Sequence, residues 1–235
     1  MLPHHVAIIM DGNRRWAKQR RFDALRGHSQ GSNTLKDIAS YAHERGITYL
    51  TCFAFSTENW QRPQIEVNGL IELMKRFLMQ DMETLITDNV RLRIIGDISA
   101  FDDDLQNLFR EAEKKTSDNT GLNLTIAVNY GGQQDILHAY KRMAEDQANP
   151  SSEGDIKSYM QTSFLPRVDL LIRTGGEQRM SNFLLWDCAY AELYFSDKFW
   201  PDFSASDLDK ALLSYEARDR RFGGDSLMMK TSMNS

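Results

Sequence analysis

The sequence predicts a single α/β domain in which helices flank a largely parallel central β-sheet. Short apolar runs alternate with longer segments of helical period, which is the pattern of strands joined by crossover helices. The short runs are apolar throughout rather than at every second position, as in strands covered on both faces. With 235 residues the chain is long enough for one substantial core, expected over residues 1–225 with a flexible tail at 226–235.

Five strands and five helices are expected in alternation. The strands are predicted at residues 6–10, 49–55, 92–95, 124–128 and 169–173. The helices are predicted at residues 29–45, 66–89, 102–115, 133–144 and 206–218. Such alternation implies parallel strands joined by right-handed crossovers. The polar segment 146–155 is expected to be a surface loop within the domain.

Composition narrows the classes of function. The formal net charge of −5 argues against nucleic acid as the main partner, because such proteins usually carry a broad basic face. The two cysteines, Cys52 and Cys188, lie far apart without metal-ligand spacing, so neither a zinc site nor a disulfide framework is expected and a reducing cytoplasm fits. Neither a signal peptide nor an apolar stretch long enough to span a bilayer is expected.

Polar, glycine-rich turns follow the expected strands. Asp11-Gly12-Asn13 follows the first, and Arg173 ends the fifth before Gly175-Gly176. Because ligands of open α/β sheets bind at the carboxyl ends of the strands, we expect these turns to form one site. Glycine lets backbone N–H groups approach an anion, and the planar guanidinium suits phosphate oxygens. The sequence therefore predicts a phosphate-binding site at this edge.

Asp11 has two interpretations. It is either an ion-pair partner of the nearby arginines or a ligand of Mg²⁺ that bridges diphosphate oxygens. Its place at a strand end inside a glycine turn favours the metal. Neither the P-loop nor the dinucleotide-binding motif is present. The run Asp102-Asp103-Asp104 is typical of a helix start, where acidic residues are stabilised by the helix dipole, rather than of an aspartate-rich metal motif.

Two further patterns stay open between a structural and a functional interpretation. Basic residues cluster between Arg14 and Arg26, either as a solvated helix face or as ligands of a phosphate. The predicted helix at 66–89 carries an apolar stripe that is wider than one core contact requires. That helix either packs on two sides or covers the sheet while lining an apolar tunnel, where its methionines would adapt to a flexible hydrocarbon.

Together, these motifs resemble those of the cis-prenyltransferases. The matching residues cover nearly the whole chain, in order: 5–13, 15–17, 27–28, 53–60, 62–63, 129–132, 172–177, 179, 181–183, 191–195, 200–202 and 220–224. The resemblance implies an Mg²⁺-dependent enzyme that extends farnesyl diphosphate by repeated condensation with isopentenyl diphosphate, each new double bond being cis. It further implies undecaprenyl diphosphate as the product, the lipid-carrier precursor of cell-wall synthesis. A homodimer, an apolar tunnel and loose association with the inner face of the membrane are implied as well.

The resemblance also assigns roles to residues. Asp11 is implied as the magnesium-linked catalytic residue, and Glu192 as a second metal ligand that can come from the partner subunit. The allylic diphosphate is expected at Gly12, Asn13, Arg15 and His28, and the substrate-binding set extends to Trp16 and Arg20. Isopentenyl diphosphate is expected at Arg173, Arg179 and Ser181.

A mobile segment that closes over the substrates is implied at Ser56, Asn59, Trp60, Arg62 and Glu66, with Asn59 also implied in catalysis. Arg221-Phe222-Gly223 matches a carboxyl-terminal motif that reaches the neighbouring active site. The proton-accepting base is open between Ser56, Asn59 and a diphosphate oxygen.

Several of these positions have a plain structural alternative. Trp60 and Trp200 suit packing, His28 suits a helix cap, and Glu192 suits an ion pair. Two functional rivals also stand beside the synthase: a non-catalytic partner subunit and a phosphate-ester hydrolase.

Three positions depart from the family pattern. Arg14 stands where many bacterial members have glycine, Ala24 replaces an arginine that commonly contacts the diphosphate, and Val128 stands where a smaller alanine lines the tunnel in some members. Arg26 is a candidate replacement for the missing arginine at position 24. The departure at Val128 leaves product length open.

Overall fold

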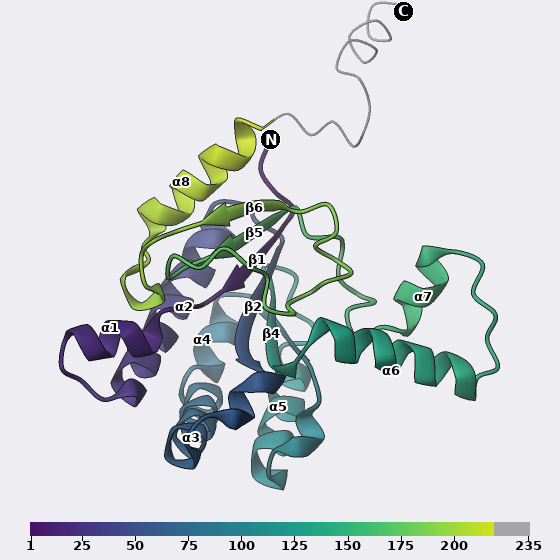
Figure 1. Ribbon diagram of the computed structural model, residues 1–235, viewed down its shortest axis with the longest axis horizontal. Helices are drawn as coiled ribbons and strands as arrows, with labels where there is room; N and C mark the ends of the chain where they lie inside the picture. Colours follow the sequence, from purple (N-terminus) through teal and green to yellow (C-terminus); the bar gives the residue numbers. More distant parts are fainter. Residues whose placement is uncertain (219–235) are drawn as a thin grey trace, which may run out of the picture.

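A computed structural model describes residues 1–218 and places them in one α/β domain (Figure 1). Its six strands form a single sheet in the order β3-β4-β2-β1-β5-β6, and every neighbouring pair is parallel. The strands are β1 His5–Ile9, β2 Tyr49–Ser56, β3 Arg91–Ile95, β4 Asn123–Tyr130, β5 Leu170–Arg173 and β6 Glu192–Phe195. The predicted parallel α/β architecture is confirmed. The tail predicted at 226–235 and the motif at 221–223 lie outside the described residues.

Eight α-helices are present in the described residues. They are α1 Asn13–Gln19, α2 Ala24–Glu44, α3 Gln64–Gln80, α4 Met82–Thr87, α5 Asp103–Lys115, α6 Gly132–Glu145, α7 Glu153–Tyr159 and α8 Ala205–Glu216. Side chains satisfy the first backbone N–H groups of the long helices: Asp23 accepts from Arg26 N at the start of α2, and Asp102 accepts from Leu105 N at the start of α5. The prediction that the acidic run opens a helix is therefore confirmed.

Short elements account for most differences from the prediction. The helices α1 and α7 and the edge strand β6 were not expected, and α7 begins inside the segment predicted as a loop because Ser152 and Asp155 form a capping box. Asn129 and Tyr130 belong to β4 rather than to the turn after it. Among residues 1–218, no helix combines the length and the apolar character that crossing a bilayer requires.

The prediction of one continuous helix over residues 66–89 was wrong. The segment is divided at Asp81, which ends α3 and starts α4. Asp81 accepts an ion pair from Lys36 of α2, with Nζ and Oδ1 2.9 Å apart. Neither proline nor glycine marks this position, so the break is held by a contact between helices rather than by local sequence.

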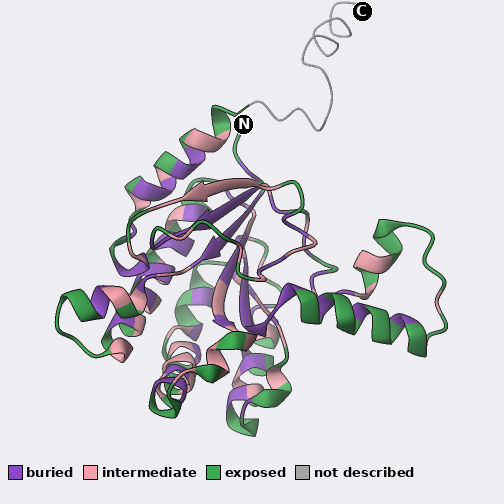
Figure 2. Ribbon diagram, in the orientation of Figure 1, coloured by how far each residue is buried: buried purple, intermediate pink, exposed green. Residues whose placement is uncertain are grey.

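The central strands of the sheet are largely buried (Figure 2), and hydrophobic clusters cover both of its faces. Alternate residues of β1 serve opposite faces: Val6 and Ile8 pack into the larger cluster, whereas Ala7 and Ile9 pack into the smaller one. The larger cluster is built with α2, α3, α4, α5 and α8. Cys52 and Cys188 are both buried and unpaired, and burial raises the pKa of each thiol, as expected for small core residues.

Candidate active site

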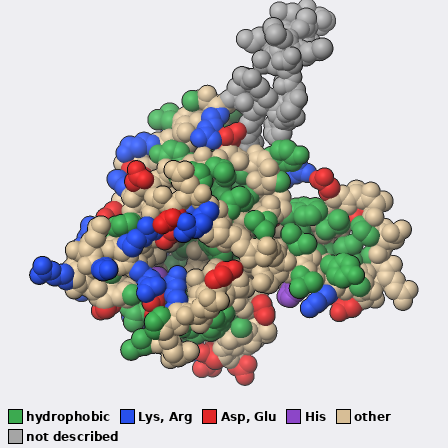
Figure 3. Space-filling model, in the orientation of Figure 1, with side chains coloured by type: hydrophobic (Ala, Val, Ile, Leu, Met, Phe, Trp, Pro, Cys, Tyr) green, Lys and Arg blue, Asp and Glu red, His purple; other side chains and the backbone are tan. Residues whose placement is uncertain are grey.

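A cavity of about 1330 Å³ opens at the carboxyl ends of the central strands and extends between the sheet and the helices α2 and α3. Lys and Arg side chains gather around its mouth, seen as a hollow in Figure 3. Polar residues that follow β1, β2 and β5 line this mouth, as the sequence predicted from the shared edge of the strands.

Asp11 lies at the centre of the polar end. Its Oδ2 atom is 3.0 Å from Nη2 of Arg173 and 3.1 Å from Nη2 of Arg15. Arg15 Nη1 also lies 3.5 Å from the carboxylate of Glu177. The ion pairs of Arg15 therefore connect α1 to the turn after β5. The Asp11 side chain is 30% exposed, whereas that of Arg173 is 5% exposed, so the carboxylate is the accessible member of the pair.

Two glycines make this arrangement possible. Gly12 has φ of +109°, and a Cβ there would lie 2.7 Å from Cδ1 of Phe199. Gly175 has φ of +87°, and a Cβ there would lie 2.6 Å from Nη2 of Arg15. Both positions require the left-handed backbone that glycine adopts most easily, and both leave room for a neighbour that approaches closely.

Arg173 is fixed by the loop that follows β5. Its Nη1 donates to the carbonyl oxygen of Arg179 at 2.5 Å and to Oγ of Ser181 at 2.7 Å. Ser181 and Asn182 both have positive φ, of 48° and 61°, which few residues other than glycine adopt. Asn182 stabilises this turn by accepting from the backbone N–H of Gln133 at 2.9 Å. Asn182 was not assigned a separate role from the sequence, and its position in the matching motif was the available signal.

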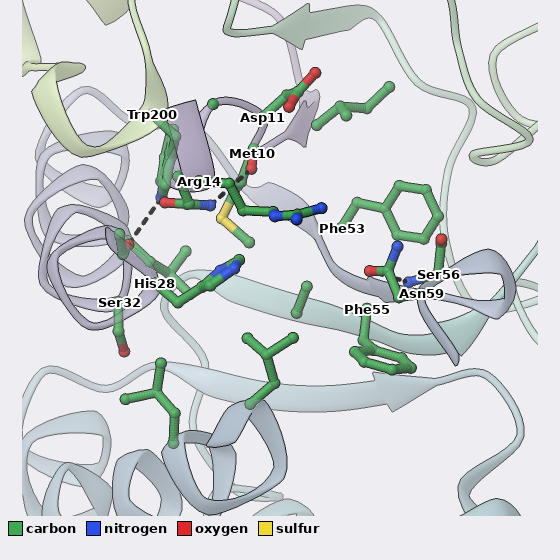
Figure 4. A pocket seen from close by; sticks show the side chains of 18 of the residues that line it. Met10, Asp11, Arg14, His28, Ser32, Phe53, Phe55, Ser56, Asn59 and Trp200 are labelled. Carbon is green, nitrogen blue, oxygen red and sulfur yellow. Dashed lines mark hydrogen bonds between the residues drawn. The ribbon is translucent and has the colours of Figure 1, made fainter. Parts of the chain in front are cut away.

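A second group of charges surrounds the buried carboxylate of Glu66 at the start of α3. Arg62 Nη1 is 3.2 Å from Oε1, Arg14 Nε is 3.4 Å from Oε2, and His28 Nε2 is 3.6 Å from Oε1. Burial, together with the positive charge of Arg62, lowers the pKa of His28 to about 4, so this imidazole is neutral near pH 7. The helix-cap interpretation of His28 was wrong, because α2 begins before it and is capped by Asp23. Figure 4 shows Arg14 and His28 on one side of the cavity and Phe53 and Phe55 on the other.

The basic cluster near the amino terminus contributes to the cavity from α1 and from the turn that follows it. Arg14, Lys18 and Arg21 all line the cavity and are exposed. Arg14 and Lys18 are four residues apart on α1 and share a helix face, whereas Arg21 lies beyond the end of the helix with φ of 59°. These three cations are therefore solvated and face the cavity, and the helical spacing of Arg14 and Lys18 was a signal for two of them.

The end of β2 has an irregular backbone, and four consecutive residues there line the cavity. The pairing register with β4 shifts between Phe53 and Phe55 and again before Ser56. In a regular strand successive side chains point to opposite faces, but Phe53, Ala54, Phe55 and Ser56 all line the cavity. Ser56 then starts a short turn in which its backbone N–H donates to Oδ1 of Asn59 at 3.2 Å. Asn59 also lines the cavity, as predicted.

Beyond the charged groups, the cavity becomes apolar. The stripe on α3 provides part of its wall, while other residues of the same helix pack into the larger cluster. The apolar residues that line it come from α2, α3, α5, β3 and β4: Leu35, Leu70, Leu73, Met74, Phe77, Leu78, Leu92, Ile94, Phe109, Ile126 and Val128. The cavity thus joins a cationic mouth to an apolar interior, an arrangement suited to a molecule with an anionic head and a hydrocarbon tail.

Eleven of the predicted site residues line this cavity: Asp11, Gly12, Asn13, Arg15, His28, Ser56, Asn59, Arg62, Arg173, Arg179 and Ser181. Glu66 does not line it but contacts His28 and Arg62, which do.

Three predicted substrate-binding residues do not line the cavity and contact other parts of the described chain. Trp16 Nε1 donates to Oδ1 of Asp202 at 2.7 Å, which joins α1 to the segment before α8, and Arg20 pairs with the same carboxylate. Trp60 Nε1 donates to Oδ1 of Asn129 at 2.8 Å, which joins the turn after β2 to β4, and its ring packs against Phe101. Trp200 is buried but also lines the cavity.

The two carboxylates expected to share a metal are not brought together within one chain. Glu192 starts β6, and its register partner is Leu170 at the opposite end of β5 from Arg173. It forms an ion pair of 2.6 Å with Arg218. Over residues 1–218, no three carboxylate, histidine or cysteine groups converge as a metal cluster.

Comparison with known proteins connects this site to a family. A family model described as "Putative undecaprenyl diphosphate synthase" matches residues 9–223. The isoprenyl transferase of Ralstonia nicotianae is 47% identical over 97% of this chain and 90% of its own length. The chain belongs to the cis-prenyltransferase family.

Two further cis-prenyltransferase relatives are close. The (2E,6E)-farnesyl-diphosphate-specific ditrans,polycis-undecaprenyl-diphosphate synthase of Haemophilus influenzae is 48% identical over 95% of this chain and 96% of its own length. The crystal structure of lavandulyl diphosphate synthase from Lavandula x intermedia, in complex with dimethylallyl diphosphate, superimposes with a TM-score of 0.91 at 39% identity, covering 94% of this chain and 98% of the other.

The structure of this cis-prenyltransferase places on the cavity all three positions that were expected to depart from the family pattern. Arg14 and Ala24 line the mouth, and Val128 lines the apolar part. Arg26 does not line the cavity, and its guanidinium lies over the ring of Phe22, 4.6 Å from the centroid. Lys18 and Arg21 are cations that line the same cavity as Ala24.

Proposed function

We propose that this cis-prenyltransferase extends farnesyl diphosphate by repeated condensation with isopentenyl diphosphate, and that the product is undecaprenyl diphosphate. The observation that carries the proposal is the position of the Asp11–Arg173 pair at the mouth of a long apolar cavity. Relatives that act on farnesyl diphosphate are nearly half identical to the chain over almost its full length, which supports the same substrate.

The two diphosphates occupy the two cationic groups in this proposal. Arg173, Arg179 and Ser181 bind isopentenyl diphosphate, because two guanidinium groups and a hydroxyl supply several donors for one anion. The allylic diphosphate lies against Gly12, Asn13, Arg15 and His28, with Arg14 on the same side. Its hydrocarbon extends into the apolar part of the cavity, where burial favours it.

Asp11 is the residue that would hold Mg²⁺. One accessible carboxylate beside groups that bind diphosphate fits this ion, which is usually bound by one or two carboxylates together with substrate phosphates. Mg²⁺ would neutralise negative charge on the leaving diphosphate. Glu192 would reach the site only from the partner subunit of a homodimer, since its own chain holds it at the other end of the sheet.

The chain's own residues act mainly by position and charge. The allylic C–O bond breaks, the π-electrons of isopentenyl diphosphate form the new C–C bond, and a proton leaves to restore a double bond. Arg15 and the neighbouring donors stabilise the departing diphosphate. The proton is accepted by a diphosphate oxygen or by the Ser56–Asn59 turn, which lines the same space. Arg62 and Glu66, at the start of α3, would close over the substrates.

The site of action follows from the chemistry of the product. A long polyprenyl diphosphate partitions into lipid, so we expect the enzyme to work in the cytoplasm in loose contact with the inner face of the membrane. The lipid would then serve as the carrier precursor for cell-wall synthesis.

The decisive experiment is product chromatography after incubation of the purified chain with both substrates and Mg²⁺. We expect a polyprenyl diphosphate whose formation stops when a chelator is added. Release of phosphate without elongation would instead indicate a hydrolase, and no product from the chain alone would indicate a non-catalytic subunit.

One alternative reaction is favoured by a specific observation. The structure with a TM-score of 0.91 is a lavandulyl diphosphate synthase bound to dimethylallyl diphosphate. A single condensation of two such molecules would need only the mouth of the cavity. Incubation with dimethylallyl diphosphate alone separates the two reactions, because it would yield a product only in the alternative.

A further inference from the structure

Residues 129–132 join the end of β4 to the start of α6, and none of them lines the cavity. They contact two loops that do line it, one at the end of β2 at residues 56–61 and one after β5 at residues 174–182. We refer to these two loops as the Asn59 turn and the diphosphate loop. The segment between β4 and α6 therefore lies behind both polar parts of the site.

The buried side chain of Asn129 is bonded at both ends of its amide. Its Oδ1 accepts from Nε1 of Trp60 at 2.8 Å, and its Nδ2 donates to the carbonyl oxygen of Asp97 at 2.9 Å. The backbone N–H of Asp97 donates in return to the carbonyl oxygen of Asn129 at 3.2 Å. The paired ends of β3 and β4 thus fix the orientation of the oxygen that receives the indole N–H.

Trp60 transmits this constraint to the Asn59 turn. Its ring packs edge-on against Phe55, with centroids 5.1 Å apart, and lies 5.4 Å from the ring of Phe101. Asn59 directly precedes Trp60, lines the cavity and accepts from the backbone N–H of Ser56 at 3.2 Å (Figure 4). Because the indole is held on its N–H and on its ring, the backbone position of Asn59 is held with it.

The start of α6 supports the diphosphate loop through separate hydrogen bonds. The backbone N–H of Gly132 donates to the carbonyl oxygen of Asn182 at 2.6 Å, and that of Gln133 donates to Oδ1 of the same residue at 2.9 Å. Ser181, the preceding residue, supplies the hydroxyl that accepts from Arg173 at 2.7 Å. The diphosphate loop is therefore held without the side chain of Asn129.

Gly131 lies where the two loops approach each other. A Cβ at this position would be 2.6 Å from Nδ2 of Asn182 and 3.2 Å from Oγ1 of Thr57. Asn182 Nδ2 also donates to Oε1 of Glu58 at 3.4 Å, which links the diphosphate loop to the Asn59 turn directly. A side chain at position 131 would therefore push the loops apart.

From these contacts we infer that Asn129 is a positioning residue, whose side chain sets the place of Asn59 in the site by holding the indole of Trp60. The inference rests on the proposed function, in which the Asn59 turn faces the reacting atoms. Asn129 itself touches no substrate in this arrangement. It acts on geometry, and a displacement of about 1 Å in a catalytic site can lower the rate by about 10²-fold.

Asn129→Gly tests the inference by removing the side chain alone. Glycine adopts the φ of +46° found at this position without strain. In steady-state incorporation of isopentenyl diphosphate, kcat should fall by about 10- to 100-fold. The KM for isopentenyl diphosphate should change by less than about twofold, because the diphosphate loop keeps its own hydrogen bonds.

Asn89→Gly is the matched control. Asn89 also has a positive φ, of 55°, and its Oδ1 accepts from the backbone N–H of Thr120 at 2.9 Å. It precedes β3 and so lies at the edge of the sheet opposite the site. Both kinetic constants should stay unchanged in this variant, even where thermal unfolding shows lower stability.

Trp60→Phe breaks the same hydrogen bond from its other side. The substitution removes the N–H donor but keeps an aromatic ring against Phe55 and Phe101. It should lower kcat as Asn129→Gly does, and it tests the inference alone if Asn129→Gly does not fold. The double variant should be no slower than the slower single variant, because both substitutions remove one interaction.

The outcomes separate this inference from the proposed function. If Asn129→Gly and Trp60→Phe keep a normal kcat, Asn129 does not position Asn59, while the enzymatic function stands. A raised KM for isopentenyl diphosphate with unchanged kcat would also overturn the inference, as would losses that multiply in the double variant. If the unmodified chain incorporates no isopentenyl diphosphate, the proposed function itself fails, and the inference with it.

Discussion

Arg173 donates a hydrogen bond from Nη2 to Oδ2 of Asp11 over 3.0 Å, which joins the carboxyl ends of the neighbouring strands β5 and β1. The same guanidinium is held from its other side by Ser181 and by the carbonyl oxygen of Arg179. The arginine is therefore fixed in place before any ligand arrives, and the aspartate is the member of the pair that faces the cavity. Preorganised charges of this kind stabilise a transition state without rearranging during the reaction.

The first prediction concerns Asp11. Asp11→Ala should lower kcat by about 10²–10³-fold, the effect of losing one preorganised electrostatic group of about 3–4 kcal/mol. Incorporation of isopentenyl diphosphate measures this, with thermal unfolding to verify the fold. Asp197→Asn is the control, because Asp197 follows β6 at the same edge of the sheet but does not line the cavity. Near-normal incorporation by Asp11→Ala would remove Asp11 from the mechanism.

The second prediction concerns the shape of the Arg173 side chain. Arg173→Lys keeps the charge but loses the planar fork that reaches Asp11, Ser181 and the carbonyl of Arg179 together. The KM for isopentenyl diphosphate should rise by about tenfold or more, since one hydrogen bond to a charged group contributes about 1.5–3 kcal/mol. Steady-state kinetics with each substrate varied separately checks this. Arg167→Lys, at an exposed ion pair with Glu153, should leave both KM values unchanged.

The third prediction concerns Glu66, whose carboxylate is buried among Arg14, His28 and Arg62. Glu66→Gln leaves these groups without their negative partner. The free energy of unfolding should fall by about 2–3 kcal/mol, below the full effect for a buried pair because Arg14 is largely exposed. Urea denaturation checks this. Glu72→Gln on the exposed side of the same helix should change stability by less than about 0.5 kcal/mol, and an equal effect of both variants would contradict the prediction.

The fourth prediction concerns pH. His5 is fully buried, donates from Nδ1 to the carbonyl oxygen of Pro166 at 2.9 Å and accepts from Thr51 at Nε2, and burial lowers its pKa to about 4. In the unfolded chain the pKa is about 6.5, so between these values only the unfolded state binds the proton. Protonation of His5 in the unfolded chain therefore leaves the free energy of unfolding unaffected above about pH 6.5. As the pH falls from there toward 4, it lowers the free energy of unfolding by about 3 kcal/mol in total. The lowered pKa of His28 acts in the same direction.

Urea midpoints measured across this range test the pH dependence. His5→Gln should flatten the slope of stability with pH, even if it also lowers stability near pH 7 through its lost packing. His4→Gln, at the exposed neighbour, should leave the slope as it is. A slope that His5→Gln does not change would assign the effect to other groups.

Much of the fold could be predicted from the sequence, because the apolar runs and the polar turns that follow them indicated the same parallel sheet. The strands covered on both faces read as continuous apolar runs, such as Val6–Ile9 within β1, and their polar turns marked one edge. The strand β6 lacked that signal, since it is a half-buried edge strand that begins with Glu192. The division at Asp81 also lacked one, because Lys36, distant in the sequence, fixes it.

Part of the candidate site could likewise be predicted from the sequence, and part could not. The residue types and their place at strand ends predicted that Asp11 and Arg173 would meet, and they do. The contribution of Lys18 depended on a helix too short to be recognised from its pattern, and that of Arg21 on the turn after this helix. The position of consecutive residues of β2 on one cavity accompanies a register shift against β4, which the sequence of β2 alone does not specify. The assignments of Trp16 and Trp60 rested on family likeness, and the structure shows packing contacts for both.

The alternation of side chains along β4 links the pairing of the sheet to the chemistry of the cavity. Val128 and Ile126 belong to the row that lines the cavity, while Thr125 and Ala127 face the other side of the sheet. A slip of one residue during folding would exchange the two rows and present a hydroxyl and a methyl group to the hydrocarbon. The pairing register of one strand therefore decides whether a bound lipid would meet branched apolar side chains or small and polar ones.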